Sequence, residues 1–147
     1  MEKLKSVKRN ITFLIGKITN DSYSATIKKL TVLQQIGFIQ LVPARLVGGR
    51  WHLKVAIEHT FSAFERKANI ARSEPLEFIV RLLGERQVGV ALQKAEFGNE
   101  DLVLIFEKNA FADKKQLLHG LNFTEKKAKI EKKNENWFVE KTTLVEI

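Results

Sequence analysis

The sequence predicts an α+β fold: a single domain over residues 1–147, with a small, mostly antiparallel or mixed sheet flanked by several helices. Its length of 147 residues suits one compact domain. Hydrophobic residues make up 44% of the chain and charged residues 29%, which is typical of a globular protein and argues against intrinsic disorder. Short apolar runs alternate with stretches of helical periodicity, so both strands and helices are expected.

The first segments predict a strand, a helix and a second strand. Residues 11–15 are β-branched and aromatic, as in a buried strand. A helix over 23–36 follows Asn20-Asp21-Ser22, which offers a cap. Residues 38–42 are the second expected strand, ended by Pro43.

The middle of the chain is expected to be helical. A long helix over 50–67 has one buried stripe, formed by Leu53, Ile57, Phe61 and Phe64. Ser73-Glu74-Pro75 is a helix start, with a hydroxyl cap, an acidic residue and a proline in the first turn. Gly84 ends that apolar helix, and a further helix is expected over 85–95.

The last third predicts one more strand and one more helix. Residues 102–106 are the clearest buried strand of the chain, and a helix over about 110–119 follows it. Residues 122–133 are rich in lysine, and the final segment, 137–147, ends in apolar residues.

Composition removes several classes of chemistry. The chain has no cysteine, which excludes disulfides, thiolate metal sites and a cysteine nucleophile. His52 and His59 are two helical turns apart, about 10.5 Å of rise, which is too far for one metal ion. We therefore expect no catalytic residue, no metal and no cofactor. No apolar run approaches the ~20 residues of a membrane helix, so a soluble cytoplasmic protein without a membrane partner is expected.

The net charge of +8 favours a polyanionic partner. Its distribution is uneven: residues 1–44 carry +5, residues 45–86 carry +3, and the remainder is balanced. Six of the seven arginines lie in 45–86, where their planar guanidinium groups suit phosphate. The five lysines of 126–133 are interpreted as a solvated face. The basic start of the chain is equally compatible with a solvated terminus and with a nucleic-acid contact.

Two further patterns have simple structural explanations. Gly48-Gly49-Arg50 precedes a helix like an anion-binding loop, but it lacks the spacing of the known phosphate-binding motifs, so a plain turn is favoured. Glu74 suits the first turn of its helix, and Glu77 and Glu85 can each pair with Arg81. The residues alone therefore indicate a binding module and not an enzyme.

Residues 76–92 resemble one family closely. The stretch is similar to the signature of the TPRKB-like (Cgi-type) kinase-binding subunits of the KEOPS complex, roughly Glu-Ile-Leu-Val-Arg-x-Ser-Gly-x-Arg-Gln-Ile-x-x-Ala-Ile. The matching positions are Glu77, Val80, Arg81, Gly84, Arg86, Gln87 and Ala91. Leu83 and Gly89 depart from it, which affects the local surface chemistry. The resemblance covers about 50–106.

The resemblance implies a non-catalytic subunit that binds and regulates the small atypical kinase of KEOPS directly and meets the other KEOPS subunits indirectly. It also implies recruitment of tRNA by its single-stranded 3′ CCA end for threonylcarbamoyl-adenosine modification. The candidate tRNA-binding residues are Arg66, Lys67, Arg72, Arg81 and Arg86; for the two within the signature, pairing with Glu77 and Glu85 is an equal alternative. The candidate kinase-binding residues are Leu76, Ile79, Leu83, Val88, Leu144 and Ile147.

Two other functions stay open. One is a free-standing basic RNA-binding module without a kinase partner, and the other is a hydrolase that turnover by the isolated protein would reveal.

Overall fold

The computed structural model describes residues 9–145, so the basic residues before Arg9 and the candidate Ile147 lie outside the described residues. The elements in this range are β1 (Ile11–Ile18), α1 (Tyr23–Leu33), β2 (Ile39–Pro43), the 3-10 turn η2 (Ala44–Leu46), α2 (Arg50–Glu65), α3 (Glu74–Leu83), α4 (Val88–Lys94), β3 (Leu102–Glu107), α5 (Lys114–Leu121), β4 (Phe123–Glu125) and α6 (Glu135–Leu144). The predicted α+β class is confirmed.

Contacts between residues divide the chain into two compact units. The sheet unit consists of the residues up to 44 together with 97–129. The helical unit consists of 45–96 together with the residues from 130 onward. Each unit is therefore built from two separate stretches of sequence, and the single domain over 1–147 stays a prediction.

The sheet unit contains a four-stranded sheet in the order β2-β3-β1-β4. Every pairing is antiparallel. Pro43 is tolerated at the end of β2 because β2 is an edge strand. Proline has no backbone N–H, and at this position the sheet does not need one as a hydrogen-bond donor. The short strand β4 was not expected, since it lies at the start of the lysine-rich stretch.

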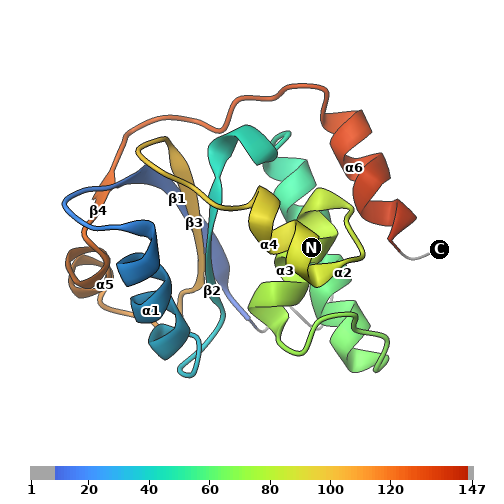
Figure 1. Cartoon of the computed structure of the whole chain (residues 1–147), viewed down its shortest axis with the longest axis horizontal. Coiled ribbons are helices and arrows are strands. Elements are labelled where there is room, and N and C mark those ends of the chain that lie inside the picture. The colour runs from blue at the N-terminus through green and yellow to red at the C-terminus, as the bar shows by residue number, and fades with distance from the viewer. Residues whose placement is uncertain (1–8, 146–147) are drawn as a thin grey trace. The chain divides into compact units, whose positions relative to one another are not determined.

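One face of this sheet is covered by α1 and α5, which lie side by side (Figure 1). The hydrophobic core of the unit joins alternate residues of the strands to both helices, including Leu30 of α1 and Leu117 and Leu121 of α5. Ser22 caps α1 by accepting a hydrogen bond from the backbone N–H of Ala25 at 3.1 Å, so the expected cap is confirmed.

The helical unit is organised around α3, which packs against α2, α4 and α6 (Figure 1). Most of α3 is buried, as its apolar sequence predicts. Gly84 ends it in the left-handed region at φ 64°, a conformation that glycine adopts without steric cost. The helix expected from residue 85 begins only at Val88, because the Glu85 carboxylate accepts the Gln87 N–H at 3.1 Å and holds the turn open.

Candidate protein and RNA interface

The signature stretch contains a buried ion pair. The Arg81 guanidinium Nε donates to Glu77 Oε2 at 2.7 Å, and the two side chains are only 2% and 0% exposed. The other oxygen, Glu77 Oε1, accepts the backbone N–H groups of Ile70 and Ala71 at 2.8 and 2.6 Å. Glu77 therefore holds the connector between α2 and α3 against the side of α3. The predicted pairing of Glu77 with Arg81 is confirmed, but it is internal and not at the surface.

This burial removes Arg81 from the candidate tRNA contacts. A guanidinium that is 2% exposed and bound to a buried carboxylate has no surface to offer to a phosphate. The expectation from the signature is corrected here: Arg81 acts within the fold. Glu85 pairs with Lys94 at 3.3 Å instead of with Arg81.

The remaining predicted tRNA-binding residues are exposed, but they do not form one cluster. Arg66 and Lys67 follow the end of α2, and Arg72 precedes α3. Arg86 follows the opposite end of α3, whose ten residues span about 15 Å. The structure therefore divides these cations between the two ends of one helix.

Arg86 is tied to the C-terminal end of α6. Its guanidinium donates a hydrogen bond to the carbonyl oxygen of Val145. Beside it, Gly84 lies so close to α6 that a Cβ at that position would be 2.5 Å from the carbonyl oxygen of Lys141. These contacts place the end of α6 next to the turn between α3 and α4.

The predicted kinase-binding residues differ in accessibility. Leu144 is 54% exposed, and Leu76, Leu83 and Val88 are half-buried. Ile79 is only 4% exposed and belongs to the core, so its assignment to a contact surface is wrong. It faces inward because the apolar face of α3 packs against the other helices of the unit.

The N-terminus of α2 is occupied by an anion of the chain itself. Glu135 Oε2 accepts the backbone N–H groups of Trp51 and His52 at 2.9 and 3.2 Å. Gly49, at φ 154°, makes room, since a Cβ there would be 2.2 Å from the same carboxylate. The plain turn favoured at Gly48-Gly49-Arg50 is corrected here: the helix start that follows does bind an anion, which is the carboxylate of Glu135 in α6.

His52 is fully buried beside this cap. Its Nδ1 accepts the Gly48 N–H at 2.8 Å, so its Nε2 carries the proton and donates to the carbonyl oxygen of Leu82 at 3.0 Å. Burial lowers the pKa of His52. The hydrogen bond to the Leu82 carbonyl and the negative charge of Glu135 act in the opposite direction, but their effects are smaller. No group of three His, Asp or Glu residues that could hold a metal ion is found among residues 9–145.

Two exposed tryptophans were missed by the sequence analysis. Trp51 is 50% exposed and Trp137 is 54% exposed, although large aromatic side chains are usually well buried. The Lys141 ammonium lies 4.7 Å from the centre of the Trp137 ring. The signal available in the sequence was that both tryptophans stand next to polar or charged residues rather than within an apolar run.

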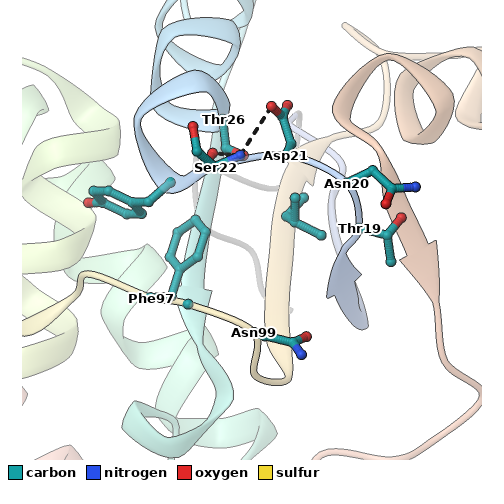
Figure 2. A pocket seen from close by; sticks show the side chains of 10 residues that line it. Thr19, Asn20, Asp21, Ser22, Thr26, Phe97 and Asn99 are labelled. Atoms are coloured by element: carbon teal, nitrogen blue, oxygen red, sulfur yellow. Dashed lines mark hydrogen bonds between the residues drawn. The ribbon is translucent and has the colours of Figure 1, made fainter.

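The sheet unit has a pocket of about 560 Å³, lined by both polar and apolar side chains, that the sequence analysis also missed. Figure 2 shows side chains from the start of α1 on one side and Phe97 and Asn99 on the other. Tyr23 and Phe97 meet edge to face at 4.7 Å between ring centres. Asp21 pairs with Lys29 at 2.7 Å, and this hydrogen bond lowers the pKa of Asp21. Hydroxyl, amide and carboxylate groups give this pocket hydrogen-bonding capacity without a histidine among its lining residues.

The comparisons with known proteins assign the chain to no family. No protein family model matches the chain, and no curated protein matches it. No helix described between residues 9 and 145 combines the length and apolarity needed to cross a membrane.

Proposed function

We propose that the chain is a non-catalytic KEOPS subunit that binds and regulates the small atypical kinase of the complex and helps to recruit tRNA in the cytoplasm. The observation that carries the proposal is the signature over residues 76–92, which supplies α3, its terminating glycine and α4. The exposed Leu144 and the half-buried Leu76, Leu83 and Val88 support a protein-binding surface on the helical unit. Exposed Arg66, Lys67, Arg72 and Arg86 support a phosphate-binding role.

The kinase test is co-purification followed by an ATPase assay of the kinase with and without this chain. We expect a stable complex and a change in the ATPase rate. Leu144→Glu should weaken the complex, because it places a charge in an apolar contact; this side chain is 54% exposed, so the fold should tolerate the change. Ile36→Glu, at a 62% exposed position on the sheet unit, is the matched control. A kinase that is not retained, or an unchanged ATPase rate, would contradict this part of the proposal.

The tRNA test measures affinity as a function of salt concentration. Arg86→Glu and the double variant Arg66→Glu/Lys67→Glu should weaken binding and reduce the slope of log K against log salt by about one for each lost phosphate contact. Removal of the 3′ CCA end should weaken binding to the wild-type chain. Equal affinity for intact and trimmed tRNA would eliminate the role of the 3′ end.

The same two assays separate the alternatives. A chain that binds tRNA but not the kinase would be the free-standing RNA-binding module that the net charge of +8 also favours.

A further inference from the structure

Two exposed indole rings lie at one end of the helical unit. The backbone N–H of Trp51 donates to the Glu135 carboxylate at 2.9 Å, and Trp137 follows Glu135 by two residues. The path from Trp51 to Trp137 therefore consists of one hydrogen bond, the Glu135 side chain and two residues of helix. This path keeps the two tryptophan backbones within about 15 Å of each other. Neither ring contributes to the core in proportion to its size, since each is at least half exposed.

One lysine follows each tryptophan by one helical turn. Lys54 is one turn after Trp51 on the same side of α2, and Lys141 is one turn after Trp137 on α6. The lysine run reaches the same end of the unit, because the Lys133 N–H donates to the carbonyl oxygen of Gly48 at 3.0 Å, three residues before Trp51. Lys132 precedes it and is exposed.

The charge of this region is positive. Lys54, Lys132, Lys133 and Lys141 compare with two exposed acids of the stretch, Glu131 and Glu140, and with Glu85, which interacts with Lys141 as well as with its ion-pair partner Lys94. The third acid of the stretch, Glu135, is only 9% exposed, and its charge faces the N–H groups at the start of α2. A polyanion therefore meets an excess of cations beside two aromatic surfaces.

We propose that this tryptophan–lysine patch, defined by Trp51, Lys54, Lys132, Lys133, Trp137 and Lys141, binds single-stranded nucleic acid. Bases stack on the two indole rings, and the lysines contact the phosphates between them. Stacking needs unpaired bases, since the bases of a duplex are already stacked on one another. The inference deepens the proposed function and rests on it, because it names the surface that receives the single-stranded end of an RNA.

The test uses a fluorescent RNA tetranucleotide, 5′-ACCA, and the full-length chain. We expect binding that quenches tryptophan fluorescence and weakens with salt. Trp137→Ala and Trp51→Ala should each lower the affinity about five- to 150-fold, the range for one lost base–aromatic stack. Trp137→Tyr, which keeps an aromatic face, should restore most of it. Lys132→Glu/Lys133→Glu should reduce the salt slope, by about 0.7 for each lost contact to a single strand.

Val32→Ala is the matched control, because it removes a similarly exposed apolar side chain, 61% exposed, from the sheet unit and outside both proposed surfaces. Unchanged affinity in both tryptophan variants, or no binding of the tetranucleotide, would overturn the inference. Loss of binding to phosphatidylglycerol vesicles, with unchanged RNA affinity in the same variants, would also overturn it. Kinase co-purification of the tryptophan variants distinguishes this inference from the proposed function. A variant that no longer binds RNA but still co-purifies with the kinase has lost only the function of this patch.

Discussion

Glu77 combines two structural tasks that are usually divided between residues. One carboxylate oxygen binds two N–H groups of the connector between α2 and α3, and the other binds Arg81. Because both side chains are buried, removal of either partner leaves a charge without compensation. Two of the residues that match the KEOPS signature, Glu77 and Arg81, therefore stabilise the fold of this chain.

We expect Glu77→Gln and Arg81→Met each to lower the free energy of unfolding by about 3–5 kcal/mol. Urea unfolding followed by tryptophan fluorescence measures this loss, since Trp51 and Trp137 both belong to the helical unit. Glu85→Gln, which breaks the more exposed pair with Lys94, is the control and should cost much less. Equally small losses in all three variants would argue against a structural role of the buried pair.

His52 should make the helical unit sensitive to mild acid. Burial lowers its pKa in the folded state, so below the ordinary histidine pKa of about 6.5 the unfolded chain binds more protons than the folded one. The stabilisation is complete above that pH and is lost as the pH falls toward the folded-state pKa, with a slope of at most about 1.4 kcal/mol per pH unit. Urea midpoints at pH 7.5 and 5.5 measure the effect, and His52→Gln should reduce the difference between them. An unchanged difference would assign the acid sensitivity to other groups.

At the scale of elements, α2 begins on a carboxylate supplied by α6. Glu135→Ala removes the acceptor for the Trp51 and His52 N–H groups and the negative charge at a helix N-terminus. We expect a loss of about 1–2 kcal/mol in the free energy of unfolding of the helical unit, the range for a helix cap. Glu140→Ala, an exposed position of the same helix, should have little effect. Similar urea midpoints for the two variants would contradict the capping role.

The sequence predicted the elements whose own residues determine them. The runs 11–15, 38–42 and 102–106 became β1, β2 and β3 because β-branched and apolar side chains suit a buried sheet. The three-residue strand β4 has one buried residue, Phe123, and exists through its pairing with the distant β1, which no local pattern encodes. Helix α5 starts at Lys114 because Asp113 accepts the Gln116 N–H at 3.1 Å, a cap that the sequence analysis overlooked.

At the scale of the whole molecule, the candidate site was only partly predictable. The spacing of Glu77 and Arg81 indicated their pairing, but no local pattern indicated that both would be buried. Glu135 is 84 positions from Trp51 and 83 from His52 in the sequence, so no local motif could predict its contact with α2. The lysine run was interpreted as a solvated face, and the structure adds that its end lies beside Gly48.

The lysine run also provides a natural place to cut the chain. Residues 126–133 belong to no helix or strand, and trypsin cleaves after exposed lysines such as Lys127 and Lys129. A cut there breaks the covalent connection to α6, while the Glu135 carboxylate and the bond from Arg86 to Val145 still join α6 to the helical unit. The released fragment should therefore co-elute with the rest of the protein in gel filtration, as a bound peptide, and Glu135→Ala should lower the fraction that co-elutes.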